Sequence, residues 1–223
     1  SSDLANNDLF LKLWHEINYK SIGFSMKNRE HAQKSDNKWF PFNKAGEFRK
    51  WYGNQEYVVN WKNDGSEIKD YRDENGKQRS RPQNIEYYFK ESISWSDVTS
   101  STNAFRFYPC GFIHGNVAHS VFDFKNDEKA EFLLFLNNKF CSDLVKILSP
   151  TMHFDIGYFN KLPMPNMQEI TKKVSVDKLI NLAKNDWDSY EISWDFTQNP
   201  IIRTEQPNLE QAFNTWQQQN ADA

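Results

Sequence analysis

The chain has 223 residues, enough to bury a sizeable hydrophobic core in one large domain or two small ones. We expect a cytoplasmic protein without membrane contact, because Cys110 and Cys141 suit neither a disulfide framework nor a zinc site, and because the sequence has no secretion signal and no run of about 18 apolar residues. The net charge of -3 argues against a generic binder of polyanions, since domains that rely on non-specific phosphate contacts are usually basic.

The N-terminal stretch Asp3–Ile17 has apolar residues at helical spacing, although its segment Phe10–Trp14 could equally be a strand. Residues 18–37 are polar and lack a clear period, which predicts an irregular connection. Short aromatic segments follow. Pro41 excludes a helix at the first of them, Phe48–Tyr52 could form one or two helical turns, and the last predicts a strand from Tyr57 to Trp61.

The most polar stretch, Asn63–Pro82, carries turn signals at Asp64-Gly65 and Asn75-Gly76 and could hold a short helix between them. The next part of the chain favours strands, because its short segments are rich in aromatic and β-branched residues. These segments are 85–89, 92–98, 105–109, 111–113 and 120–124.

Helical spacing returns at Glu128–Leu148, where Ser149-Pro150 ends the pattern. We then expect a strand at Met152–Ile156, an extended exit at Leu162–Pro165, a helix at Val174–Trp187 and a polar helix at Asn208–Asn220. The tail beyond Pro200 should be peripheral. Together these elements predict an α/β (α+β) fold. Its mainly antiparallel twisted sheet is built from segments between Tyr57 and Ile156, with a helix at Phe132–Leu148 packed against it. The predicted divisions are an N-terminal helix and connection (1–37), a β-rich recognition domain (38–166) and a C-terminal helical segment and tail (167–223).

The block from Lys38 to Trp61 combines aromatic rings with cations. Its eight aromatic residues are Trp39, Phe40, Phe42, Phe48, Trp51, Tyr52, Tyr57 and Trp61, and its cations are Lys38, Lys44, Arg49 and Lys50. Cations neutralise phosphates and rings stack on bases, so this mixture suits a nucleic-acid surface. The alternative is an aromatic core element with solvated cations between the core positions.

A second basic cluster precedes two amide side chains. Lys77, Arg79 and Arg81 lead into Gln83 and Asn84, whose amides have the donor and acceptor pattern that reads adenine edges in a major groove. A solvated loop is the alternative reading. The nine candidate DNA-binding residues are therefore Lys38, Lys44, Arg49, Lys50, Lys77, Arg79, Arg81, Gln83 and Asn84.

No constellation in the chain indicates catalysis, since it has no glycine-rich cofactor loop, no Gly-x-Ser-x-Gly and no His-Glu-x-x-His. We predict no catalytic residue, no metal site and no cofactor in this chain. Asp64 with Glu67 and Lys69 resembles elements of metal-dependent nucleases, but the spacing is tighter than in a strand-borne site. The pair His114 and His119 has no obvious third metal ligand nearby.

Several blocks together resemble the target-recognition region of large adenine-specific DNA methyltransferases. The similarity is greatest to the PglX-like enzymes of BREX phage-defence systems, which are related to fused type II restriction-modification methylases. It covers roughly residues 6 to 197 and is most specific at Lys38–Gly53. The other blocks are Asn7–Ile17, Val58–Trp61 with Asn63–Gly65, Arg81–Asn84 with Tyr87–Phe89, Phe132–Leu148, Leu162–Pro165, and Asp186–Glu191 with Ser193–Phe196.

This resemblance implies a non-catalytic domain that recognises a DNA sequence. A helix, a strand and then Leu-Pro-x-Pro also resemble the recognition domains of type I restriction specificity subunits. The family's Asn-Pro-Pro-Tyr motif and glycine-rich S-adenosylmethionine loop are absent here, so the resemblance places that cofactor in the catalytic domain of a parent enzyme. At the start, Leu4-Ala5-Asn6-Asn7 replaces the expected Thr-Gly-x-Asn turn, and no contact is assigned there. The implied partners are double-stranded DNA, the catalytic methyltransferase domain and other defence-system proteins. The alternative functions are a protein-interaction module of a defence complex and a small metal-dependent nuclease.

Overall fold

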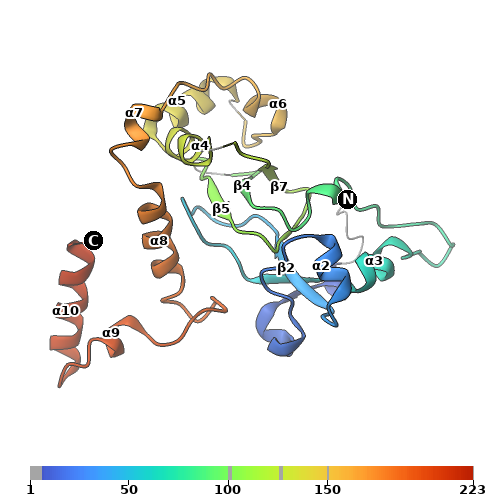
Figure 1. The fold of residues 1–223 in the computed structure, drawn as a ribbon, viewed down its shortest axis with the longest axis horizontal. Coiled ribbons are helices and arrows are strands. Elements are labelled where there is room, and N and C mark those ends of the chain that lie inside the picture. Colours follow the sequence, from blue (N-terminus) through green and yellow to red (C-terminus); the bar gives the residue numbers. More distant parts are fainter. Residues whose placement is uncertain (1–6, 100–101, 126–127, 150, 223) are drawn as a thin grey trace.

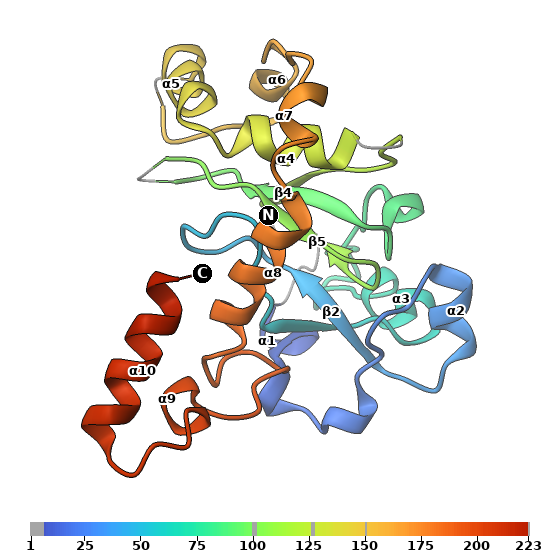
Figure 2. The same ribbon diagram turned by 60° about the vertical axis from the view of Figure 1, so that its left-hand side comes forward.

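The computed structural model describes residues 7–99, 102–125, 128–149 and 151–222. Two small sheets lie at its centre (Figure 1). Helices α4 to α7 gather over one sheet, α2 and α3 lie beside the other, and α8 to α10 run along one flank. The turned view in Figure 2 keeps α4 to α7 at the same end of the molecule and α10 on the outside.

The first sheet joins the N-terminal segment to the aromatic block. Its strand order is β1 (Leu11–Leu13), β3 (Tyr57–Asn60), β2 (Trp39–Asn43) and β6 (Ile113–His114). The β1–β3 and β2–β3 pairs are antiparallel, and β2–β6 is parallel. Strands β2 and β3 are buried at almost every position, which explains their continuous apolar character.

The predicted N-terminal helix is wrong beyond Phe10, and the alternative of a strand within Phe10–Trp14 is confirmed. Only α1 (Asn7–Phe10) is helical, and the chain then extends into β1 before the short 3-10 turn η1 (Trp14–Glu16). Leu11 pairs with Val59 and Leu13 with Tyr57, so pairing with β3 replaces the helix that the local spacing favours. The part of the prediction before Asn7 lies outside the described residues. A second helix, α2 (Arg29–Lys34), and a 3-10 turn, η2 (Tyr19–Ser21), occupy the stretch predicted to be irregular.

The second sheet has the order β5 (Arg106–Tyr108), β4 (Ser92–Ser96) and β7 (Ala118–Val121), and both of its pairs are antiparallel. A buried hydrogen bond links the sheets, because Asn43 donates from Nδ2 to Ser94 Oγ at 2.7 Å. Trp51, which lies outside both sheets, joins the aromatic block to the β5 segment: its N–H donates to Phe105 O at 2.9 Å, and its carbonyl accepts from Phe107 N at 2.8 Å. The mixed, mainly antiparallel fold is confirmed, but its strands are divided between two sheets.

The expected long helix at Glu128–Leu148 is two helices, α4 (Glu128–Leu136) and α5 (Lys139–Leu148). The break falls at two adjacent asparagines, Asn137 and Asn138. Asn138 accepts from Cys141 N at 2.9 Å and so caps a new helix. Both helices cover the second sheet as predicted, since Leu133 and Cys141 share a hydrophobic core with Ile93.

Three other local predictions are wrong. Phe48–Tyr52 is not helical, because Trp51 has a left-handed backbone (φ 70°) where it bridges Arg106. Ile85–Tyr87 is the 3-10 turn η3 rather than a strand. Met152–Ile156 makes only an isolated bridge, His153 with Val98, before Asp155 caps the short helix α6 (Ile156–Phe159).

The polar stretch after β3 contains α3 (Lys62–Lys69), whose first turn is left-handed at Asn63, Asp64 and Gly65. α3 packs with β1 and β3 around a second core that includes Phe10, Val59 and Ile68. None of the described helices combines the length and the apolar character that crossing a bilayer requires.

The C-terminal part contains α7 (Gln168–Thr171), α8 (Val176–Trp187), α9 (Pro200–Arg203) and α10 (Leu209–Ala221). The predicted helices at α8 and α10 are confirmed. After α8 the chain returns to the N-terminal segment, where Trp14 Nε1 donates to Ile192 O at 2.8 Å and the Trp194 ring lies 5.2 Å from that of Phe24. α10 then leads away from the sheets (Figures 1 and 2).

Candidate nucleic-acid interface

Arg49, a predicted DNA contact, is half-buried against the end of α8. Its Nη1 atom lies 2.7 Å from Asp186 Oδ2, and its guanidinium lies 5.0 Å from the Trp187 ring centroid and 5.7 Å from that of Tyr190. The Arg49 side chain is 28% exposed. Arg49 therefore attaches α8 to the aromatic block, and its contact with DNA stays a prediction.

The other three cations of this block also have partners within the chain. Lys50 Nζ donates to the Asn137 carbonyl at 2.6 Å, between α4 and α5. Lys44 Nζ lies 4.2 Å from the Tyr57 ring centroid, and Lys38 Nζ lies 3.5 Å from Glu67 Oε1. Lys44 and Lys38 remain half-buried rather than enclosed, so a phosphate could still approach them.

Most of the aromatic residues in the block belong to the core. Phe40, Phe42, Tyr52 and Trp61 are buried, and Trp39, Trp51 and Tyr57 are half-buried. Phe48 alone among the eight is well exposed, at 51%. The aromatic-core reading is therefore correct for this block, and the block offers no row of free rings on which successive bases could stack.

The second group, Lys77 to Asn84, lies on a protruding polar turn. Asp73 N donates to Lys77 O at 2.9 Å, and Gly76 closes the turn with φ 74°. Lys77, Arg79 and Arg81 are exposed, and only a loose ion pair of 3.9 Å, from Arg79 to Asp73, joins these three to a carboxylate of the described residues. The turn therefore presents three cations to solvent.

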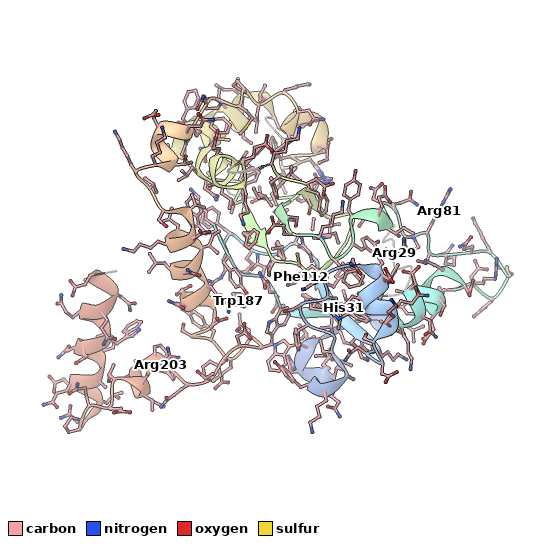
Figure 3. The ribbon with its side chains drawn as sticks, viewed as in Figure 1. Arg29, His31, Arg81, Phe112, Trp187 and Arg203 are labelled. Carbon is pink, nitrogen blue, oxygen red and sulfur yellow. The ribbon has the colours of Figure 1, made fainter. Side chains whose placement is uncertain are left out.

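The two predicted groups do not form one site. In Figure 3, Arg81 lies beyond Arg29 at one end of the molecule, whereas Trp187, which stacks on Arg49, lies toward the other end. Lys44 and Arg49 line one cleft, and Gln83 and Asn84 line another that shares no residue with it. The two groups therefore do not line one common concave face.

The cleft beside Asn84 lies between η3 and β7 and has a volume of about 330 Å³. Asn84, the residue just before η3, has a left-handed backbone with φ 53°. Gln83 Nε2 donates to the Arg81 carbonyl at 3.0 Å. Opposite them, β6 and β7 contribute His114, His119 and Ser120. Sequence reasoning missed this wall, because only the folded chain brings residues 114–122 next to residues 83–88.

His114 is neutral at physiological pH. Burial lowers the pKa of His114 to about 4, and the opposing effect of the Lys90 backbone is smaller. The His114 Nδ1 atom lies 3.5 Å from Asn43 Nδ2, while its buried Nε2 atom makes no hydrogen bond with the described residues. The cleft wall thus contains a buried imidazole that lies beside the Lys90 backbone.

The cleft around Lys44 and Arg49 is larger, about 670 Å³, and differs in charge. Three carboxylates, Glu47, Glu56 and Asp186, line it together with the two cations. Burial raises the pKa of Glu56, although Lys44 opposes this effect. A lining with this many carboxylates is a poor surface for a phosphate backbone.

The nuclease-like residues have structural partners. Asp64 accepts hydrogen bonds from Arg29 Nε at 3.0 Å and from Lys69 Nζ at 2.7 Å. Burial alone would raise the pKa of Asp64, but these two partners outweigh burial and lower it. Glu67 accepts from Asn60 Nδ2 at 2.8 Å. Across the described ranges, no three His, Cys, Asp or Glu side chains are arranged to hold a metal ion.

No protein-family model matches the chain. The chain is 37% identical to "Adenine-specific methyltransferase PglX" of Lacticaseibacillus casei (strain Zhang) over 226 aligned residues, which cover 98% of this chain and 18% of that protein. It is 32% identical to "Adenine-specific methyltransferase BrxX" of Escherichia coli O9:H4 (strain HS) over 200 residues, which cover 87% of this chain and 15% of that protein. The chain therefore spans less than a fifth of the length of these two curated relatives.

Similarity at this level over nearly the whole chain makes it a homologue of adenine-specific methyltransferases. More particularly, it is homologous to one segment of the PglX-like enzymes. Both PglX and BrxX contain a segment that matches this chain. The resemblance of the sequence blocks to PglX-like enzymes is confirmed.

Proposed function

We propose that this chain is the target-recognition module of a PglX-like adenine-specific DNA methyltransferase and that it does not transfer methyl groups itself. One observation carries the proposal: almost all of this chain aligns with less than a fifth of two methyltransferases, while the methyltransferase motifs are missing from its own sequence. An enzyme that modifies a base must take it out of the duplex, so a separate part has to hold the flanking DNA. A chain without catalytic motifs suits that second role.

The exposed turn supports this proposal physically. Lys77, Arg79 and Arg81 are exposed cations on a segment that projects from the body, as a contact with a phosphate backbone requires. The proposed partners are double-stranded DNA, the catalytic domain of the parent enzyme with its S-adenosylmethionine, and other proteins of a BREX-type phage-defence system. The proposed compartment is the cytoplasm.

An ionic-strength series on duplex binding tests the proposal. Phosphate contacts release counterions, so the logarithm of the affinity should fall linearly with the logarithm of the salt concentration. Lys77→Ala and Arg81→Ala should each reduce that slope by about one unit. Lys178→Ala removes an exposed lysine on α8 and serves as the matched control, with no change expected. Affinity that does not depend on salt, or an equal effect of the control, would contradict the proposed role.

Exchange of the segment within a full-length methyltransferase tests sequence recognition directly. Replacing the homologous segment of a PglX-like enzyme with this chain should change the methylated motif while methylation continues. An unchanged motif would show that recognition lies elsewhere in the enzyme.

A protein-interaction module is the second candidate, because α5 exposes large apolar side chains. Ile147 is 77% exposed and Phe140 is 62% exposed. Ile147→Asp should leave duplex binding intact and weaken association with the purified catalytic part of the enzyme if α5 is a docking face. Weaker duplex binding with unchanged association would instead assign α5 to the DNA-binding surface.

A further inference from the structure

The cleft between η3 and β7 has a lining of unusual composition. Its twelve residues include neither a carboxylate nor a lysine or arginine. Its polar groups are the amides of Gln83, Asn84 and Asn116, the hydroxyls of Ser120 and the tyrosines, and the imidazoles of His114 and His119. Such a wall offers both hydrogen-bond donors and acceptors without charge, which suits a neutral polar ring rather than an ion.

Aromatic rings form another part of the same wall. The Tyr87 and Phe122 ring centroids lie 4.9 Å apart with 31° between the planes, and the His114 ring meets Phe122 edge-on at 5.0 Å. Tyr87 and Phe122 are both half-buried, and both line the cleft. A flat heterocycle that entered the cleft would meet ring surfaces as well as amides.

The Nε2 atoms of the two imidazoles in the wall are buried, so they are not available to a ligand in the cleft. The Lys90 backbone lies beside His114, and His119 Nε2 lies 3.5 Å from Asp97 Oδ1. The polar edge of a ligand would therefore meet the amides and hydroxyls of the cleft.

We propose that this cleft holds one unpaired nucleobase of a nucleic-acid strand, with Asn84 and Ser120 facing its polar edge and Tyr87 and Phe122 contacting its ring. This inference rests on the proposed DNA-recognition function and adds to it a site for a base outside the helix. A hollow is the wrong shape for reading a base that stays paired, because a groove is read by side chains that project into it. A base that has left the stack is instead recognised by its polar edge and by aromatic contacts in a pocket.

The neighbouring cations indicate a base within a strand rather than a free nucleoside. Arg81 precedes Gln83 by two residues, and Lys77 and Arg79 lie on the same exposed turn. A strand whose base occupies the cleft would place its phosphates near this turn. A free nucleoside has no phosphate and gains nothing from these cations.

The test compares two duplexes of identical sequence that carry the adenine analogue 2-aminopurine at one position. In one duplex the analogue is paired with thymine, and in the other it lies opposite an abasic site. The chain should bind the unpaired duplex about tenfold more tightly, since stacking of one base on an aromatic side chain has a value of that order. The fluorescence of the unpaired analogue should also fall on binding, because stacking quenches it.

Two variants assign the effect to the cleft. Tyr87→Leu removes a ring, and Ser120→Ala removes a hydroxyl on the opposite wall of the cleft. Each should abolish most of the tenfold preference and leave binding of the paired duplex unchanged. Phe213→Leu on α10, which removes an exposed ring outside the cleft, should change neither affinity. Thermal melting of each variant shows whether a lost preference reflects lost folding.

The outcomes separate this inference from the function on which it rests. Salt-dependent binding with equal affinity for both duplexes would overturn the base pocket and leave the recognition role standing. Binding of neither duplex at any salt concentration would overturn both. Free 2-aminopurine riboside binding as tightly as the unpaired duplex would show that the cleft takes a nucleoside and would overturn the strand as its source.

Discussion

The side chain of Asn137 bonds to both backbone groups of Phe105. Its Oδ1 atom accepts from Phe105 N at 3.1 Å, and its Nδ2 atom donates to Phe105 O at 2.9 Å. Asn137 is 5% exposed and lies between α4 and α5, so this pair joins the break in the helices to the segment that enters β5. The Asn137 amide thus gives the Phe105 backbone two hydrogen bonds of the kind that a neighbouring strand would provide.

Asn137→Ala should therefore be strongly destabilising. The change leaves the buried Phe105 N–H without a partner, whereas Phe105 O keeps the hydrogen bond from Trp51 N. Loss of one buried partner costs about 1 to 3 kcal/mol, so we expect the free energy of unfolding to fall by about that amount. Urea denaturation measures this change. Asn185→Ala, at an exposed position on α8, is the control and should have little effect. Similar losses for both variants would show that the Phe105 pair contributes little.

We expect the main effect of replacing Arg49 to be a loss of stability. Arg49→Ala removes the ion pair with Asp186 and the contact with the Trp187 ring, which together should lower the free energy of unfolding by about 1 to 2 kcal/mol. Asp186→Asn should destabilise in the same direction, because it removes the partner of the same cation. If Arg49→Ala keeps full stability and its duplex binding depends less on salt, Arg49 is a DNA contact rather than a structural residue.

The stability of the fold should depend on the protonation of His114. Its pKa is about 4 in the folded chain, where burial opposes the charge, and about 6.5 when unfolded. The unfolded chain therefore binds more protons between these values, so stability is complete above about pH 6.5 and falls as the pH drops toward 4. The shift corresponds to about 3 kcal/mol.

Urea midpoints at pH 7 and pH 5 would reveal this dependence. His114→Gln should remove much of it, because the glutamine amide does not titrate. Asp64 provides the comparison: its pKa is lowered, so the stability that it contributes is lost only as the pH falls below about 4. An unchanged slope between pH 7 and pH 5 in His114→Gln would contradict the assignment to His114.

Gly111 should tolerate no side chain. It has φ +111°, and a β-carbon there would lie 2.9 Å from the backbone nitrogen of Ser25 and 3.1 Å from that of Met26. Gly76 has φ +74° but nothing within 4 Å, so it is the matched control. Gly76→Ala should cost about 1 kcal/mol from backbone strain alone, and Gly111→Ala should cost clearly more, because backbone atoms must move. Thermal melting of the two variants checks this order, and equal losses would contradict it.

Features that depend on neighbouring residues were predictable from the sequence. The helices α8 and α10 follow from apolar spacing together with caps at Ser175 and Asn208, whose side chains accept from Lys178 N and Gln211 N. The polar character of residues 63–82 likewise predicted exposed cations at Lys77 and Arg81. The break at Asn137 was not predicted, because the apolar spacing continues across it and the amide pairs with a residue 32 positions away.

The sequence by itself thus determined the homology and the elements whose capping and periodicity are local. Only the tertiary structure decided that residues 11–13 form a strand, that Arg49 faces α8 rather than solvent, and that the 83–88 and 114–122 segments enclose one cleft. The physical reason is the range of the interactions. A cap or an apolar period acts within about one or two helical turns, whereas strand pairing, an ion pair across 137 residues and a cleft depend on partners that the chain brings together only by folding.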